Sequence, residues 1–260
     1  MESAAASREP AVGRRPRDFV RVAGPDAEDY LQRTLSNDVA ALVPGESCEA
    51  LLLTAKGRVI APMRVLRRAE DDFLLLTEPG LGERVRGELV RMRFAAKAEI
   101  EPEEHRSYLL LGQEKGGILN EDYGMPAVEV LDQEPPQGRT LTEDELEALR
   151  IVAGTPRFGA EIDERVLPAE AGLVERAVSF TKGCFPGQEP IARLHYRGHA
   201  NRRLRVLDVE MAEPGTDVVW AGKAVGRVTS AVPGHALAFV RIEVPEDAEL
   251  EVGGAEARLH

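Results

Sequence analysis

Alternating apolar and polar positions predict several strands in the first half of the chain. Residues 50–68, "ALLLTAKGRVIAPMRVLRR", predict two strands joined by a turn at Lys56-Gly57. In the second of these strands, Val59 and Met63 recur at the period-two spacing that marks one face of a sheet. Three further apolar runs predict buried strands at residues 18–24, 72–77 and 107–112.

Three other segments carry apolar residues at the helical spacing, namely residues 24–39, 79–92 and 141–154. In the last of them Thr142 precedes the helix and Glu145 follows three residues later, which is the pattern of a capping box. Gly154 is the expected stop, because glycine readily adopts the left-handed conformation that ends many helices.

The same pattern divides the chain into segments. Residues 132–140, "DQEPPQGRT", interrupt the strands and helices and predict a linker. After Arg203 only short strands with glycine-rich turns recur, which is typical of a small barrel. The predicted fold class is therefore α+β. Its predicted parts are a flexible tail (1–16), a mixed α/β subdomain (17–135), a middle subdomain (136–202) and a C-terminal β-barrel (203–260).

Composition narrows the classes of function. The 260 residues are 43% hydrophobic and 30% charged, as expected for a globular protein of two or three subdomains. The net charge of -12 argues against affinity for nucleic acid or an anionic membrane. No apolar run reaches the roughly 18–20 residues that cross a bilayer. The first residues lack a secretory signal, and Cys48 and Cys184 make no disulfide framework, so a cytoplasmic location is expected.

Candidate chemistry concentrates at residues 181–190, "TKGCFPGQEP". The preceding run "AVSFT" predicts a strand, and Gly183 and Gly187 allow tight turns beside Cys184. In an extended segment Lys182 would share one face with Cys184, and a neighbouring ammonium group stabilises a thiolate. Lys182 and Cys184 are therefore the candidate reactive pair. The alternative is that Cys184 is a small buried apolar side chain.

A resident metal ion is not expected at this segment. His195 and His199 follow in "HYRGH", and Gly198 between them disfavours a helical pair of ligands. The two histidines are instead expected on a solvated basic loop. The chain also lacks the nucleophile-elbow, phosphate-loop and dinucleotide-binding patterns, which excludes the common hydrolase and nucleotide-enzyme classes.

The stretch "KGCFPGQE", residues 182–189, resembles the signature of the YgfZ family, tetrahydrofolate-binding proteins that help to make or maintain iron–sulfur clusters. The family is related to the T-protein (aminomethyltransferase) of the glycine cleavage system. Three further blocks are similar, at residues 22–42, 157–173 and 225–241. The resemblance implies three subdomains in a ring with tetrahydrofolate, or a derivative, in a central hole. It also implies iron–sulfur enzymes or cluster carriers as partners.

The resemblance also implies residues that bind the cofactor. Glu170 of "PAEAGL" matches the glutamate that holds the pterin in T-proteins, and a carboxylate suits an aminopyrimidine edge. Asn37 of "LSNDV" belongs to a block that lines the hole, and Gln188 of the signature is assigned to the same site. Arg193 and Arg197 are the candidates for the glutamate tail of folate, because arginine binds carboxylates through two hydrogen bonds.

Two departures from the T-protein pattern bear on the reaction. Ala61 and Pro62 stand where T-proteins carry the aspartate that assists methylene transfer, and T-proteins have no cysteine at the position of Cys184. Both favour a tetrahydrofolate-binding accessory protein acting through the Lys-Gly-Cys motif. Two alternatives stay open: a folate-dependent aminomethyltransferase or demethylase, and a folate-binding scaffold without chemistry.

Overall fold

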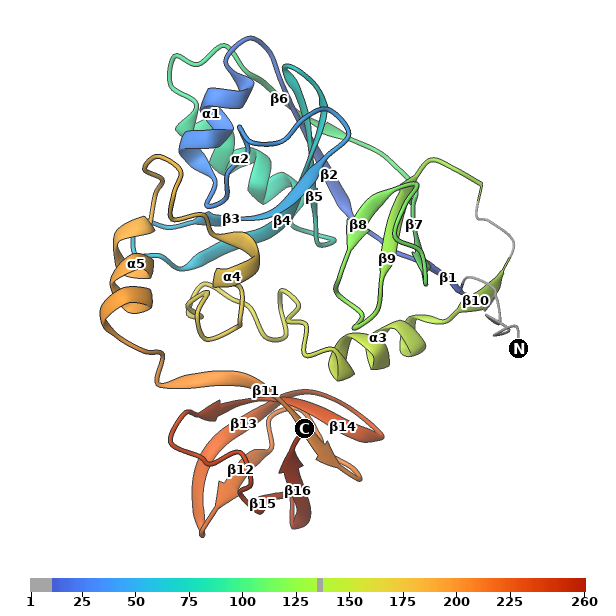
Figure 1. Ribbon diagram of the computed structural model, residues 1–260, viewed down its shortest axis with the longest axis vertical. Helices are drawn as coiled ribbons and strands as arrows, with labels where there is room; N and C mark the ends of the chain where they lie inside the picture. The colour runs from blue at the N-terminus through green and yellow to red at the C-terminus, as the bar shows by residue number, and fades with distance from the viewer. Residues whose placement is uncertain (1–10, 135–137) are drawn as a thin grey trace, which may run out of the picture.

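The computed structural model describes residues 11–134 and 138–260 and consists of two open sheets, a largely irregular middle segment and a barrel (Figure 1). The first sheet has the strand order β3-β4-β5-β2-β6. Its strands are β2 (Asp18–Ala23), β3 (Ser47–Leu53), β4 (Val59–Ala69), β5 (Asp72–Thr77) and β6 (Glu99–Glu103). Two helices, α1 (Ala27–Thr34) and α2 (Gly82–Met92), belong to the same unit.

The two faces of the first sheet have different coverings because side chains alternate along each strand. Leu52 of β3 and Phe73 of β5 face α1 and α2 in one apolar core. Leu51 packs against the middle segment on the opposite face. Leu74 and Leu76 pack with Ile118 of the second sheet. The face opposite the helices is therefore shared between the second sheet and the middle segment.

The second sheet, in the order β10-β1-β7-β9-β8, collects strands from two distant parts of the chain. They are β1 (Ala11–Arg14), β7 (Ser107–Leu111), β8 (Ile118–Asn120), β9 (Ala127–Leu131) and β10 (Arg139–Leu141). The expected tail is therefore wrong for residues 11–14, which pair with both β7 and β10, and the rest of it, residues 1–10, lies outside the described residues. The range of the predicted mixed α/β subdomain, 17–135, contains the first sheet and three strands of the second, β7, β8 and β9.

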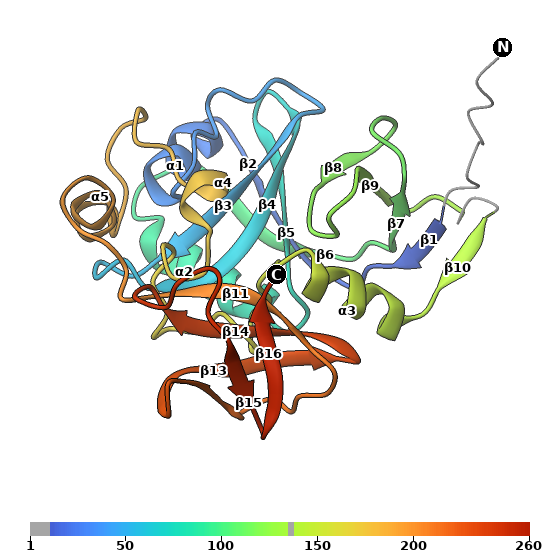
Figure 2. The ribbon, with the colours of Figure 1, turned by 60° about the horizontal axis from the view of Figure 1, so that its bottom comes forward.

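The predicted linker does not separate two units. Residues 135–137 within it lie outside the described part, but Arg139–Leu141, which begins inside the predicted linker, pairs with β1 in parallel. The following helix, α3 (Glu143–Val152), has the predicted capping box, with both hydrogen bonds present between Thr142 and Glu145. Helix α3 contacts β1 on one side and the barrel strands β13 and β14 on the other (Figure 2). Residues 139–152 thus belong with the second sheet.

The middle segment, residues 153–201 between α3 and the barrel, contains the helices α4 (Val174–Ala177) and α5 (Gln188–Arg197). The run "AVSFT" was expected as a strand and is not one, because Ala177 ends α4 and the backbone beyond it bonds to a loop, Ser179 N to Ser36 O at 3.0 Å. The solvated loop expected around His195 is also wrong, since His195 lies in the last turn of α5 and Gly198 caps that helix.

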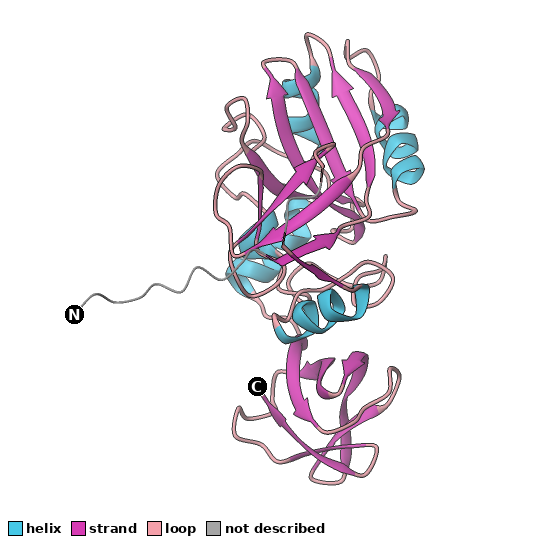
Figure 3. Ribbon diagram, turned by 90° about the vertical axis from the view of Figure 1, so that its right-hand side faces the viewer, coloured by secondary structure: helices cyan, strands magenta, loops and turns pink. Residues whose placement is uncertain are grey.

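The C-terminal barrel is confirmed and stands apart from the sheets (Figure 3). It closes in the order β11-β14-β13-β12-β15-β16. Its strands are β11 (Arg202–Val209), β12 (Asp217–Trp220), β13 (Lys223–Val232), β14 (Gly234–Arg241), β15 (Leu250–Val252) and β16 (Ala255–Leu259). Among the described residues, no helix has the length and apolar character needed to span a membrane.

Candidate functional site

A cavity with several charged lining residues lies where the two sheets and the middle segment meet. It has two adjoining parts, of about 240 Å³ and about 60 Å³. Both parts are lined by Glu78 after β5 and by Asp122 between β8 and β9. Thr155 and Pro156, which follow α3, complete the shared wall. Residues that are far apart in sequence thus line one site.

Arginines and carboxylates are paired along this wall. Arg15 Nη2 lies 2.7 Å from Glu78 Oε1. Arg17 Nε lies 2.8 Å from Glu129 Oε1, and the Glu129 side chain is fully buried. Burial alone would raise the pKa of Glu129, but the charge and hydrogen bonds of Arg17 lower it below its usual value. This pair therefore stays ionised inside the protein.

Two further arginines complete the network. Arg64 Nη2 lies 2.8 Å from Glu49 Oε1, and Arg176 Nη2 lies 2.5 Å from the same oxygen. Arg176 Nη2 also lies 2.8 Å from Asp122 Oδ1. Burial would raise the pKa of Asp122, and the charges of the four arginines outweigh it and lower that pKa. The four arginines and four carboxylates of the network balance one another in charge.

Hydrogen-bond donors in the network are nevertheless left over. The Nε atoms of Arg15, Arg64 and Arg176 are buried and have no hydrogen-bond partner among the described residues. All three side chains line the cavity. A buried donor without a partner costs about 1–3 kcal/mol, so native proteins rarely keep one. The guanidinium groups of these cavity-lining arginines suit a ligand that carries acceptor oxygens.

Lys182 of the signature points into the protein. Its ammonium nitrogen donates to the Leu35 carbonyl at 2.6 Å and to the Asn37 carbonyl at 2.7 Å. Burial lowers the pKa of Lys182 to about 8, and the opposing charges of Asp38 and Cys48 do not offset it. The lysine therefore fastens the loop after α1 to the signature loop.

The two cysteines lie in contrasting surroundings. Cys184 is exposed, whereas Cys48 in β3 is half-buried. Burial raises the pKa of Cys48 to about 11, despite the charges of Arg64 and Lys182. Because Lys182 is buried and Cys184 is exposed, the two side chains do not share a face, contrary to the expectation. The charge of the Lys182 ammonium group instead acts on Cys48, where it opposes the rise in pKa that burial causes.

Close glycine packing holds the signature loop in place. Gly187 has a φ of 82°, and a Cβ there would lie 2.5 Å from the Thr54 carbonyl oxygen and 2.9 Å from the Gly57 Cα. The loop therefore sits directly on the turn between β3 and β4. Gly183 differs, since a Cβ would meet nothing within 4 Å and its φ is not in the left-handed range.

Asn37 connects the signature loop to the cavity. Helix α1 ends at Thr34, so Asn37 lies beyond it and is not a helix cap. Its Nδ2 donates to the Glu49 carbonyl at 2.7 Å and to the Arg176 carbonyl at 3.3 Å, while its own carbonyl accepts from Lys182. The chain of bonds from Lys182 through Asn37 therefore ends at two residues of the cavity network.

Comparison with known proteins places the chain. The family model of the CAF17 C-terminal beta-barrel domain matches residues 177–260. The tRNA-modifying protein YgfZ of Edwardsiella ictaluri is 30% identical over 223 residues, covering 71% of this chain and 66% of the relative. The human mitochondrial iron–sulfur cluster assembly factor IBA57 is 29% identical over 254 residues, covering 81% and 71%. The chain belongs to the YgfZ family.

A solved structure confirms the fold of this YgfZ-family chain. The aminomethyltransferase T of the glycine cleavage system from Bartonella henselae superposes with a TM-score of 0.82. The match covers 97% of this chain and 85% of the other, at 19% sequence identity. The predicted α+β class, the T-protein-like fold and the C-terminal barrel are therefore confirmed. At this identity the likeness concerns the fold alone.

The YgfZ-family signature and the other expected cofactor residues are not all brought to the cavity. Glu170 lines a separate pocket beside α5, where Arg202 Nε lies 3.1 Å from its Oε1. Arg193 and Arg197 are exposed on α5 and do not line the central cavity, and neither does Gln188 at the start of that helix. Only Asn37, through its bonds, reaches the cavity wall.

The structure places the two residues, Ala61 and Pro62, that stand where the T-protein aspartate was expected. Pro62 lines the smaller part of the cavity, and Ala61 beside it faces the core of the first sheet. Strand β4 therefore contributes no carboxylate at this point. Glu49 and Asp122 do bring carboxylates to the cavity, but both are held by arginines.

The cavity arginines were not foreseen from the sequence, because they are scattered along it. Arg15 lies just after β1, Arg64 in β4 and Arg176 in α4. No local spacing connects them, and they meet only because the two sheets and the middle segment pack together. The sequence contains one weak signal of a buried arginine, because Arg64 stands among the apolar residues of β4.

Proposed function

We propose that this YgfZ-family chain binds a reduced folate in the central cavity and acts as an accessory protein in iron–sulfur cluster assembly or repair, with Cys184 as its reactive group. The observation that supports folate binding is the set of three arginines, Arg15, Arg64 and Arg176, that line the cavity wall. The human relative is named as an iron–sulfur cluster assembly factor, which supports the second part. The proposed setting is the cytoplasm.

The chemistry of the wall suits tetrahydrofolate. The pterin carbonyl and the glutamate carboxylates of folate are acceptors that suit the guanidinium groups of Arg15, Arg64 and Arg176 in the wall. The carboxylates of Glu49 and Asp122 accept more than one hydrogen bond each and suit the amino and ring N–H donors of a pterin. A wall with both donors and acceptors thus fits a ligand with both.

Cys184 is proposed to act outside the cavity, toward a partner. It is exposed on the signature loop and does not line either part of the cavity. An exposed thiol is accessible to an iron–sulfur enzyme or a cluster carrier. Lys182 then holds the loop in position and is not the activating neighbour of the thiol. The bonds through Asn37 join the loop to the folate cavity.

A titration with tetrahydrofolate tests the cavity. The intact chain should bind tetrahydrofolate. Arg64→Met should weaken this binding by about 1.5–3 kcal/mol, because it removes a charged hydrogen-bond donor from the cavity wall. Arg193→Met, on the exposed face of α5, is the matched control and should bind normally. Loss of binding in Glu170→Ala with none in Arg64→Met would move the folate to the pocket beside α5.

Complementation tests the thiol. In cells without the native protein, Cys184→Ser should fail to support iron–sulfur enzymes while retaining tetrahydrofolate binding, and Cys48→Ser is the control that should complement. Complementation by Cys184→Ser would leave a folate-binding scaffold. Release of ammonia from an aminomethylated carrier protein with tetrahydrofolate would instead establish the aminomethyltransferase alternative. We do not expect it, because Pro62 in the cavity wall stands where the T-protein aspartate was expected.

A further inference from the structure

Two histidines and an aspartate lie close together on the outer face of the barrel. They are Asp208 near the end of β11, His235 near the start of β14 and His260 directly after β16. Strand β11 is paired with β14 on one side and with β16 on the other. Leu207 and Val209 of β11 point into the barrel core, so Asp208 between them points outward. This places a carboxylate on the middle strand of three.

The strand register sets the two histidines on the same face. His235 of β14 is the direct partner of Asp208 across the ladder. His260 follows β16, and its backbone N–H donates to the Val206 carbonyl at 3.0 Å, which places it opposite Val206. Val206 and Asp208 are two residues apart on β11 and therefore share a face. All three side chains consequently lie on one side of the sheet.

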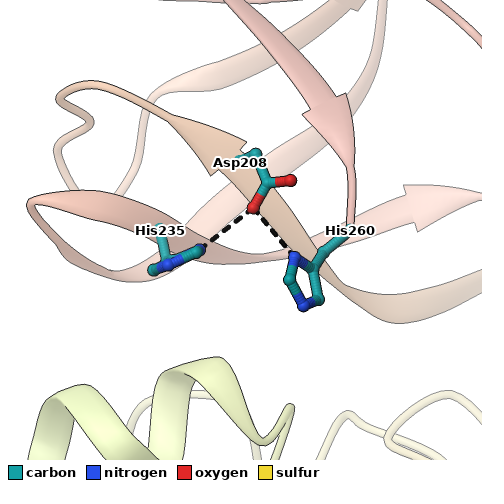
Figure 4. Close-up of side chains that lie close together, drawn as sticks. All are labelled: Asp208, His235 and His260. Carbon is teal, nitrogen blue, oxygen red and sulfur yellow. Dashed lines mark hydrogen bonds and ion pairs between the residues drawn. The ribbon is translucent and has the colours of Figure 1, made fainter.

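The three side chains converge on one oxygen (Figure 4). His235 Nδ1 lies 3.1 Å and His260 Nδ1 lies 2.9 Å from Asp208 Oδ1. One ligand atom from each residue falls within 4.8 Å of the others. The two rings are nearly perpendicular, at 87°, with centroids 5.6 Å apart. Both imidazoles thus present the same nitrogen to one point.

Hydrogen bonding does not account for this convergence. His260 Nδ1 is hydrogen-bonded to Asp208, but His235 Nδ1 is buried and has no hydrogen-bond partner among the described residues. It approaches the carboxylate closely in a direction that makes no hydrogen bond. A cation between the three atoms would satisfy this nitrogen. Arg258, the other cross-strand neighbour of Asp208, is paired with Glu256 and does not supply one.

We propose that Asp208, His235 and His260 form a binding site for one divalent first-row transition-metal ion of the zinc type. Two imidazole nitrogens and one carboxylate oxygen are a ligand set that such ions prefer. Tetrahedral coordination with bonds of about 2.0–2.1 Å requires ligand atoms about 3.3 Å apart, close to the 3.1 Å and 2.9 Å that separate the two histidine nitrogens from Asp208 Oδ1. Three protein ligands leave a position for water, so the ion exchanges with solvent. The site lies on the barrel, and its three residues line neither part of the cavity.

The test is a calorimetric titration of the full chain with Zn²⁺, carried out in a Cys184→Ser background so that the exposed thiol does not compete. One equivalent should bind. His260→Gln and Asp208→Asn should each weaken binding by roughly tenfold or more. Co²⁺ should give the visible absorption bands of a four-coordinate ion, and these should be lost in His260→Gln.

His199→Gln is the matched control, because His199 is exposed on the loop after α5 and outside this cluster. It should bind Zn²⁺ like the parent. Absence of binding by the parent, or binding that His260→Gln and Asp208→Asn leave unchanged, overturns the proposal. Equal weakening by His199→Gln also overturns it, since the metal would then bind scattered histidines. Thermal unfolding without metal checks that each variant remains folded.

Discussion

Buried positive charge is held in two different ways in this molecule. In the cavity, Arg17 is paired with the fully buried Glu129. In the signature loop, Lys182 is bound by two neutral carbonyl oxygens and forms no ion pair within the described residues. Burial opposes the charged form in both places. Only in the cavity do opposite charges outweigh burial, so the pKa of Arg17 is raised and that of Lys182 is lowered to about 8.

The cavity ion pairs and the Lys182 ammonium group therefore respond differently to pH. In the cavity network the pKa of Glu129 is lowered and that of Arg17 is raised, so this pair keeps its charges on both sides of neutral pH. The attachment of the signature loop depends on one ammonium group whose charge is lost at moderately alkaline pH.

The largest expected effect on stability comes from breaking the buried Arg17–Glu129 pair of the cavity network. Glu129→Gln leaves the Arg17 guanidinium buried beside a neutral side chain, and should lower the free energy of unfolding by about 3–5 kcal/mol. Denaturant unfolding measures it. Glu256→Gln, which breaks the exposed pair with Arg258, is the control and should change stability by less than about 1 kcal/mol. Equal effects of the two substitutions would refute the special status of the buried network.

A smaller effect should appear at Lys182 as a function of pH. In the folded protein its pKa is about 8, below the roughly 10.4 of an unfolded chain. Between these values the unfolded chain binds more protons, so this residue makes stability rise with pH. Relative to Lys182→Met, which never titrates, the parent should gain on the order of 1–2 kcal/mol from pH 8 to pH 10. Parallel stability curves of the two proteins across that range would contradict the lowered pKa.

Local patterns were enough to predict many elements of the fold. The capping box of Thr142 and Glu145 needs only four consecutive residues, and the hairpin around Lys56-Gly57 needs only one turn and its flanking alternation. Strand β1 was missed for the opposite reason. Its four residues acquire a strand conformation by pairing with β7 and β10, which are remote in sequence.

The site was predictable only in its local part. The signature and its exposed Cys184 could be located because they are contiguous. The direction of Lys182 could not, since it is set by the carbonyls of Leu35 and Asn37, about 145 residues away. Arg193 and Arg197, which are near the signature in sequence, were expected to bind the glutamate tail of folate because arginine binds carboxylates through two hydrogen bonds, but α5 carries them on an exposed surface. Nearness along the chain did not translate into nearness in space.

The smallest expected change in stability is at Gly183, beside the exposed thiol. Its backbone is not in the left-handed range and a Cβ would meet nothing within 4 Å, so Gly183→Ala should leave stability unchanged or raise it by up to about 1 kcal/mol. Gly187→Ala should be clearly destabilising, because its Cβ would press on the Thr54 carbonyl. If the open space at Gly183 serves the approach of a partner to Cys184, Gly183→Ala should still impair complementation. A variant that is stable and fully complements would show that no partner approaches the thiol from this side.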